Sequence, residues 1–190
     1  WPWGDRTVTT SFRCPNFLHF GRDYAGARDD FVYVYSPDAD DAYSATTHLV
    51  LARVPTVRIT KRDAYEYFAR LDPAGEPVWT PDVYLRGGVF TFPGRCYRCS
   101  VSYNPGLGHY LLCQILPGGD TRFEGGFGIY DAPEPWGPWT TVFFTDRWDV
   151  GPGETSSLPT KWMSDDGKTC HLVFSGDDTF SVRQVQFTID

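Results

Sequence analysis

Short runs in which apolar and polar residues alternate recur along the chain, and turn-forming residues separate them. In the clearest run, residues 125–131, Phe127 and Ile129 point to one side and the residues between them to the other. Alternation with period two predicts a β-strand with one face more buried than the other. Residues 133–139 contain three prolines, which lack the N–H needed for a sheet ladder, so we expect a stiff corner there. Residues 141–144 are then expected to return as a second strand.

The same pattern predicts strands in most of the chain, because β-branched and aromatic residues gather between clusters of Gly, Pro, Asn and Asp. We expect strands at 7–10, 12–20, 30–35, 48–54, 75–79, 96–103, 109–116, 158–163, 169–174 and 180–189. Residues 63–71 carry the signals of a helix instead of a strand. Asp63 precedes Glu66 by three positions, as in an N-terminal capping box, and Pro73 stops the pattern. We therefore expect a helix over 63–71.

Parts of the sequence repeat the same order of strands and turns. Residues 31–35 match 110–114, and residues 49–55 match 127–133 at nearly the same offset. Successive sheets with a repeat of this kind are typical of the blades of a β-propeller. A β-sandwich is the alternative, because it also consists of short strands and turns.

We therefore predict an all-β chain: a β-propeller segment of about three four-stranded blades with one short helical insertion. Blade A covers about residues 7–60, the helical insertion 61–80, blade B about 89–145 and blade C about 154–190, within one propeller-like domain, 1–190. Three blades in an open arc leave sheet edges and apolar faces uncovered. We expect the chain to be a homo-oligomer or a fragment of a larger propeller.

Composition and charge narrow the possible functions. The 190 residues include 7 Trp, 11 Tyr and 14 Phe, which suits an aromatic-rich all-β fold. The net charge of −7 opposes nonspecific nucleic-acid binding, which needs a positive surface. No apolar run is long enough to cross a membrane. The first five residues lack the basic and apolar segments of a signal peptide, and we expect that the chain begins inside a longer protein, secreted or periplasmic.

The five cysteines do not form a recognisable metal or redox motif. Cys96 and Cys99 have CxxC spacing, but no second Cys or His pair follows at zinc-finger spacing. Residues three apart on a strand also face opposite sides. We predict buried free thiols that serve as small apolar residues, with no metal site and no cofactor.

Six segments carry a resemblance to a known family: ARDDFVYVYS, LARVP, DAYEYFARLDPAGEPVW, SVSYNPGLGHYLL, GIYDAPEPWGPW and ETSSLPTKWMSDDGKTCHLVFSG. They resemble the C-terminal blades of the DUF4185-type and glycoside-hydrolase-43-like five-bladed β-propellers. Members with assigned activity cleave polysaccharides and include an endo-arabinanase branch. The resemblance implies a glycoside hydrolase that acts on an anionic or arabinan-like polysaccharide. The alternative is a non-catalytic glycan-binding or assembly module, since the chain lacks the family's N-terminal blades.

Candidate catalytic residues lie where inner strands begin, because these starts gather near the axis of a propeller. Glu154 follows a Gly-Pro-Gly loop and precedes a buried strand, and partial burial there would suit a general acid. The alternative is a loop carboxylate satisfied by the backbone of its own turn. Hydrolysis needs a second carboxylate across the sugar. Asp29 and Asp30 are the candidates, and only one of them would reach the site because neighbours on a strand face opposite ways.

Candidate substrate-binding residues are expected on the same face. Arg13, Arg95 and Arg98 would bind the carboxylates of an anionic glycan, or would instead pair with the acidic residues of the chain itself. Tyr97 beside these arginines would also fit a uronate polysaccharide lyase. Trp148 would stack on a sugar ring, although tryptophans of this kind are usually part of a core.

Overall fold

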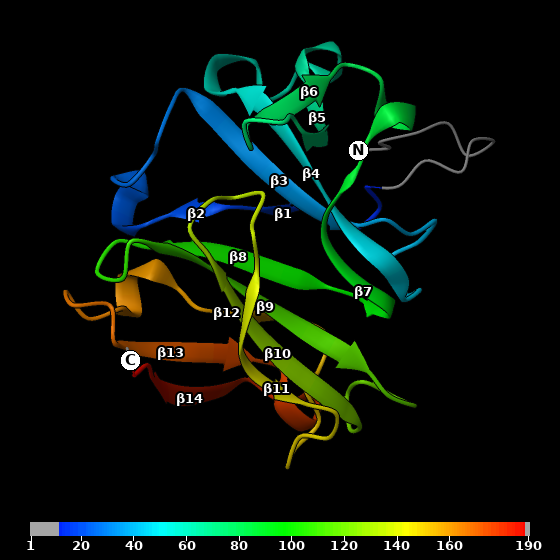
Figure 1. Cartoon of the computed structure of the whole chain (residues 1–190). Helices are drawn as coiled ribbons and strands as arrows, with labels where there is room; N and C mark the ends of the chain where they lie inside the picture. Colours follow the sequence, from blue (N-terminus) through cyan, green and yellow to red (C-terminus); the bar gives the residue numbers. More distant parts are fainter. Residues whose placement is uncertain (1–11, 189–190) are drawn as a thin grey trace. The chain divides into compact units, whose positions relative to one another are not determined.

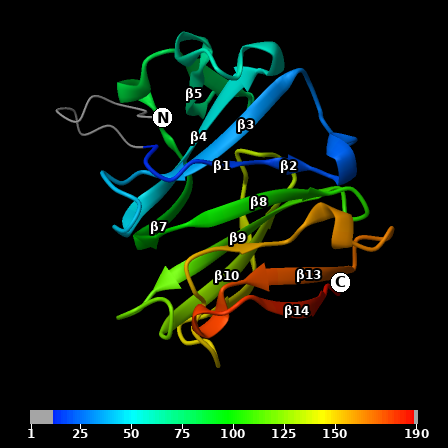
Figure 2. The same ribbon diagram turned by 180° about the vertical axis from the view of Figure 1, so that it is seen from behind.

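Strands are the main elements of residues 12–188, the part of the chain that our computed structural model describes (Figures 1 and 2). The helical elements in this part are single 3-10 turns of three residues. The all-β prediction is confirmed. The predicted strand at 7–10 and the end of the one at 180–189 lie outside the described residues. The chain divides into two units, and the described residues of unit 1 are 12–17 and 29–97, those of unit 2 are 18–28 and 98–188.

Unit 1 contains one sheet, sheet A. Its strands are β1 (Asn16–Phe17), β3 (Phe31–Pro37), β4 (Thr46–Pro55), β5 (Glu66–Leu71), β6 (Pro77–Thr80) and β7 (Gly88–Cys96). The order is β1-β3-β4-β5-β6, and β7 pairs with the other end of β4. The one-turn helices η2 (Thr56–Arg58), η3 (Arg62–Ala64) and η4 (Val83–Leu85) lie between these strands. One face of the sheet buries Phe12, Val32, Val34, Val50, Ala52, Val54, Tyr65 and Tyr67.

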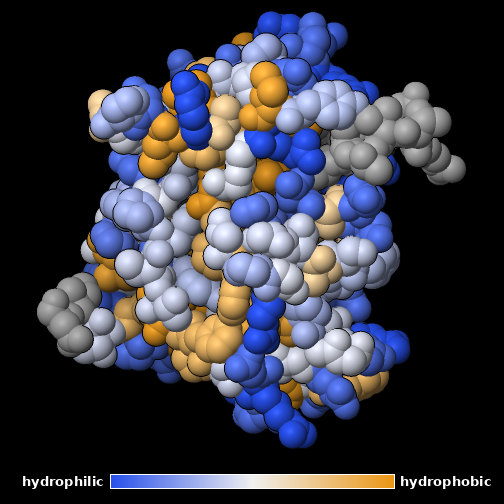
Figure 3. Space-filling view, turned by 45° about the vertical axis from the view of Figure 1, so that its right-hand side comes forward, coloured by the Kyte–Doolittle hydropathy of each residue, from blue (hydrophilic) through white to orange (hydrophobic). Residues whose placement is uncertain are grey.

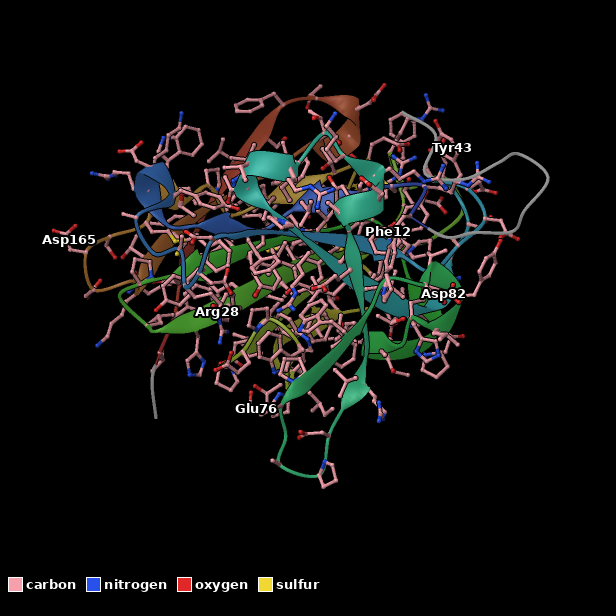
Figure 4. The ribbon with its side chains drawn as sticks, turned by 90° about the horizontal axis from the view of Figure 1, so that it is seen from above. Phe12, Arg28, Tyr43, Glu76, Asp82 and Asp165 are labelled. Atoms are coloured by element: carbon pink, nitrogen blue, oxygen red, sulfur yellow. The ribbon has the colours of Figure 1, made fainter. Side chains whose placement is uncertain are left out.

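The predicted helix over residues 63–71 is wrong. Only η3 is helical there, and the chain then extends into β5, which forms a hairpin with β6 (Figure 4 labels Glu76 at this hairpin). Glu66 does not cap a helix but pairs with Arg53 of β4 at 2.8 Å. Tyr67 and Phe68 are both buried, Tyr67 in the apolar face of sheet A and Phe68 edge-on to Trp79. Burial of aromatic side chains on both faces of a strand therefore overrides the local helix signal.

Unit 2 contains two sheets. Sheet B has the order β11-β10-β9-β8-β2, from β2 (His19–Phe20), β8 (Cys99–Asn104), β9 (His109–Pro117), β10 (Gly125–Ala132) and β11 (Thr140–Thr145). Sheet C has the order β12-β13-β14, from β12 (Ser156–Ser157), β13 (Thr169–Phe174) and β14 (Ser181–Gln186). The 3-10 turns of unit 2 are η1 (Arg22–Tyr24), η5 (Thr160–Trp162) and η6 (Gly176–Asp178). The predicted corner separates β10 from β11 and is confirmed.

Sheets B and C share one apolar core, which we call the B–C core. It contains Leu111, Cys113, Phe127, Ile129, Leu158, Met163, Cys170, Leu172, Phe174 and Phe187. Phe127 and Ile129 lie on the same face of β10, as their alternation predicts. Burial of side chains of this size is the main stabilising contribution to the packing of the two sheets.

The described residues form three sheets, as many as the predicted blades, but their strand numbers differ from four. Among residues 12–188, sheet A has six strands, sheet B five and sheet C three. The β5–β6 hairpin enlarges sheet A, and β2 adds a parallel strand beside β8 in sheet B. The predicted strand at 12–20 is split into β1 and β2, which pair with different sheets. The division into blades at the predicted boundaries stays a prediction.

Candidate functional site

Three loops of unit 2 lie at one end of sheets B and C. The pairing of Gly125 with Pro117 places the 118–124 loop there, and the pairing of Ser156 with Phe174 brings the loop before β12 next to the one after β13. These are residues 146–155 and 175–180. The inner strands β8 and β12 begin at this end of the two sheets, which is where the sequence predicts candidate site residues.

A cavity of about 590 Å³, the loop cavity, lies between the three loops. Its walls combine carboxylates with one arginine, one tryptophan and several apolar or glycine residues. They are Gly118, Phe123, Glu124, Gly125, Asp146, Arg147, Trp148, Asp149, Val150 and Asp177. Cavities of roughly 300–1,000 Å³ are typical of small-molecule sites.

Backbone hydrogen bonds hold the loops in place. The N–H of Trp148 donates to the carbonyl of Gly125 at 2.8 Å, and the N–H of Gly153 donates to the carbonyl of Thr121 at 2.8 Å. The N–H of Gly151 donates to Oδ1 of Asp177, also at 2.8 Å. A Cβ at Gly151 would lie 2.0 Å from the carbonyl oxygen of Arg122, so only glycine fits this crossing. These contacts join the three loops that form the cavity walls.

Trp148, predicted to bind substrate, lies in the wall of the loop cavity but also belongs to the edge of the B–C core. Its ring stacks on Phe174 with a centroid distance of 5.6 Å and meets Phe127 edge-on at 4.5 Å. The guanidinium of Arg183 lies 5.3 Å from the centroid of the indole. These contacts hold the half-buried ring rigidly and leave part of it at the cavity surface.

Asp149 and Asp177 of the cavity wall bind groups of unit 2 itself. Asp149 forms two hydrogen bonds with Arg183, each 2.8 Å long, and these bonds lower the pKa of the Asp149 carboxyl. Asp177 accepts the N–H of Gly151. Glu124 and Asp146 are exposed residues of the wall. Their carboxylates are suitable acceptors for the hydroxyl groups of a sugar.

The structure brings Glu154 and Arg98 together, but as an ion pair. Nη1 of Arg98 also donates to the backbone carbonyl of Glu154 at 3.2 Å, and the N–H of Glu154 donates to Oγ of Ser175 at 2.8 Å. The Arg98 side chain is 15% exposed and that of Glu154 40%. A carboxylate engaged in an ion pair of this kind suits a structural or binding role.

The other five predicted site residues belong to unit 1. Oδ1 of Asp29 accepts the N–H of Phe31 at 3.0 Å, and Oδ2 accepts the hydroxyl of Tyr33 at 2.7 Å. The backbone carbonyl of Asp30 accepts the N–H and the hydroxyl of Thr56 at 2.9 and 2.8 Å. Both residues thus contribute to the turn before β3.

The three remaining unit 1 candidates have different surroundings. Arg13 is half-buried just before β1. Arg95 lies near the end of β7 with its guanidinium 5.4 Å from the ring centroid of Phe92. Tyr97 is buried directly after β7. That these residues form one site with Glu154 stays a prediction from the sequence.

Sequence reasoning missed the acidic residues of the loop cavity. Glu124, Asp146 and Asp177 come from three loops that only the pairing of sheets B and C brings together. The available signal was glycine: pairs of glycines flank the 120–124 turn, and Gly151 and Gly153 lie in the next loop. Glycines at such spacing indicate close backbone approach.

The cysteines are free, and Cys96 and Cys99 are buried, so the prediction for this CxxC pair is confirmed. Burial raises the pKa of Cys96 to about 12 and that of Cys170 to about 11. Within residues 12–188, no group of three or more His, Cys, Asp or Glu side chains is arranged to hold a metal ion. No helix of this part of the chain has the length and apolar character to cross a membrane.

Comparisons with known proteins identify the fold. No protein-family model and no curated protein matches the sequence. Among solved structures, an exo-β-1,3-galactanase from Phanerochaete chrysosporium matches with a TM-score of 0.54 at 12% identity, over 90% of this chain and 34% of that protein. Another from Clostridium thermocellum matches with a TM-score of 0.53 at 12% identity, over 92% of this chain and 34% of that protein. The chain has the fold of a β-propeller segment.

These neighbours are five-bladed β-propeller glycoside hydrolases of family 43. The likeness to their fold supports the predicted resemblance, while its DUF4185 part stays a prediction. The chain spans about a third of their length.

Proposed function

We propose that this chain is part of a carbohydrate-active propeller and that it binds a polysaccharide or oligosaccharide in the loop cavity. The observation that carries the proposal is the cavity of about 590 Å³, whose wall combines exposed carboxylates with a rigidly held tryptophan. Carboxylates accept hydrogen bonds from sugar hydroxyls, and an indole provides apolar surface for the C–H groups of a sugar. The propeller neighbours include enzymes named as galactanases, which supports a glycan as ligand. A secreted or periplasmic location would suit this role.

Glycoside hydrolysis is the second candidate function. Glu154 favours it, because this carboxylate is partly exposed at the same end of sheets B and C as the loop cavity. In this reading Glu154 is the general acid, and Asp29 or Asp30 is the second carboxylate. The ion pair with Arg98 and the two hydrogen bonds on the Asp29 carboxylate favour binding over hydrolysis. Arg98 is also engaged by Glu154, which weakens the case for a uronate lyase.

We also propose that further blades, from a second copy or from a longer protein, complete the assembly. The 34% share of the neighbouring propellers that the chain spans supports this view. Exposed apolar residues in β11 support it as well, because Val142, Phe143 and Phe144 are 45%, 44% and 38% exposed. Figure 3 shows hydrophobic residues among the hydrophilic ones on the face that it displays.

Isothermal titration calorimetry with a panel of neutral and anionic oligosaccharides tests the binding proposal. The panel includes β-1,3-galactotriose, arabino-oligosaccharides and galacturonides. We expect Glu124→Gln and Asp146→Asn to weaken the best ligand about tenfold each, which corresponds to roughly 1.4 kcal/mol. The matched control is Asp165→Asn, an exposed acid in the turn before β13 (Figure 4), which is expected to leave binding unchanged. Absence of binding across the panel, or an equal loss in the control, would contradict the proposal. Reducing ends assayed in the same samples separate hydrolysis from binding.

A further inference from the structure

The inner strands β8 and β12 of unit 2 form a polar seam along the B–C core. Most of the buried polar side chains of the described residues lie on them: Ser100, Ser102 and Asn104 on β8 and Ser156 on β12. The two strands contact each other. Arg98 pairs with Glu154, and Oγ of Ser102 donates to the carbonyl of Leu158 at 2.9 Å; both contacts join residues 56 positions apart.

Ser100 and Ser156 occupy the position between these two contacts, because they are also 56 positions apart. Ser100 lies opposite Cys113 in sheet B, and Ser156 lies opposite Phe174 in sheet C. Directly opposed residues of antiparallel strands point to the same face. Since Cys113 and Phe174 both belong to the B–C core, both serine side chains point into the space between the sheets.

Neither serine hydroxyl has a hydrogen-bond partner within residues 12–188. Ser100 is 3% exposed and Ser156 4%, so bulk solvent does not reach them either. A buried polar group without a partner is unfavourable, and ordered water molecules usually satisfy such groups. Two hydroxyls that point into the same seam offer a water molecule both donors and acceptors.

We propose that a water molecule is bound between the hydroxyls of Ser100 and Ser156. It completes a series of three polar contacts between the inner strands: the Arg98–Glu154 pair, the water bridge and the bond from Ser102 to Leu158. The uncharged hydroxyls suit water rather than an ion. The bridge ties β12 to β8 two residues after Glu154, so it helps to fix the loop that carries this residue.

A crystal structure of the chain at about 1.5 Å resolution tests the proposal directly. We expect a density peak at roughly 2.7–3.2 Å from both serine Oγ atoms, the usual hydrogen-bond range. A direct bond between the two hydroxyls, or a bond from each to a main-chain carbonyl without an intervening peak, would overturn it.

Urea unfolding of Ser100→Ala, Ser156→Ala and the double variant provides a second test. Each single variant should lower the unfolding midpoint, and the double variant should lower it by less than the sum, because the bridge is lost only once. Ser157→Ala is the matched control, since Ser157 is the next residue of β12 and lies opposite Val173, outside the B–C core. Its midpoint should stay within error of the parent. A higher midpoint in either single variant would show a dry, unpaired hydroxyl and refute the bridge.

Discussion

Replacing Asn104 with alanine removes the side chain that joins the end of β8 to the turn before β13. Nδ2 of Asn104 donates to the carbonyl of Gly167 at 2.8 Å, and Oδ1 accepts the N–H groups of Gly106 and Leu107 at 3.1 and 3.2 Å. The side chain is fully buried, and Gly167 is buried as well. Asn104 therefore links sheets B and C within unit 2.

The expected loss of stability for Asn104→Ala follows from these contacts. The buried carbonyl of Gly167 loses its donor from Asn104, which costs about 1–3 kcal/mol. Gly106 is exposed and Leu107 half-buried, so water replaces part of their bonds, and we assign about 1 kcal/mol to both together. The free energy of unfolding should fall by about 3 kcal/mol. With an m-value of about 2 kcal/mol per molar urea, the midpoint should fall by roughly 1.5 M.

Urea unfolding followed by tryptophan fluorescence measures this change. Gln184→Ala is the control, because Gln184 is an exposed amide on β14 and a surface change of this kind stays within about 0.5 kcal/mol. If Asn104→Ala shifts the midpoint no more than Gln184→Ala does, the buried amide does not join the two sheets and the reasoning fails.

Four further predictions concern the candidate acid, the corner and the thiols. Glu154→Gln should abolish any hydrolysis of a polysaccharide and lower the melting temperature, because it breaks the ion pair with the mostly buried Arg98; full activity would remove Glu154 from the mechanism, and an unchanged melting temperature would contradict the structural role of the pair. Trp139→Ala should cost about 2–4 kcal/mol in urea unfolding, below the value for full burial because Trp139 is only half-buried; an unchanged midpoint would show that the corner does not need this ring. Cys96 and Cys170 should resist Ellman's reagent at pH 8 in the folded chain, because their raised pKa values keep them as thiols. Fast labelling at pH 8 would refute the burial of these thiols. The free energy of unfolding should also fall as pH rises above about 9, because the thiols of the unfolded chain then ionise while folded Cys96 keeps its proton up to about 12.

The local pattern predicts the fold well where burial and alternation agree. Phe127 and Ile129 share one face because the strand packs on one core, and three prolines end the pattern at the corner. The segment 63–71 fails because its helix signals are local, whereas pairing with β4 and burial of Tyr67 and Phe68 depend on distant strands. The split of residues 12–20 into β1 and β2 also depends on pairing with two different sheets.

The candidate site was predictable only in part. Arg98 and Glu154 both lie at the start of an inner strand, and this position predicts that they come together. They do so as an ion pair, which is the alternative to a catalytic role that the sequence also offers. The loop cavity combines three loops that are far apart in the sequence. No sequence motif therefore connects Glu124, Asp146 and Asp177. Trp148 lines the loop cavity, its predicted stacking on a sugar stays a prediction, and its contacts with Phe174 show that the same ring also serves the core.

Glycan binding in the loop cavity is the central claim, and an NMR titration of the ¹⁵N-labelled chain with the tightest oligosaccharide of the panel tests it most directly. The account predicts saturable chemical-shift changes of amides in the 118–124, 146–150 and 175–178 segments, the three loops around the cavity. Amides of the 105–108 and 164–168 turns, at the opposite end of sheets B and C, should not shift. Changes centred on these turns, or no saturable change with any oligosaccharide, would contradict the account.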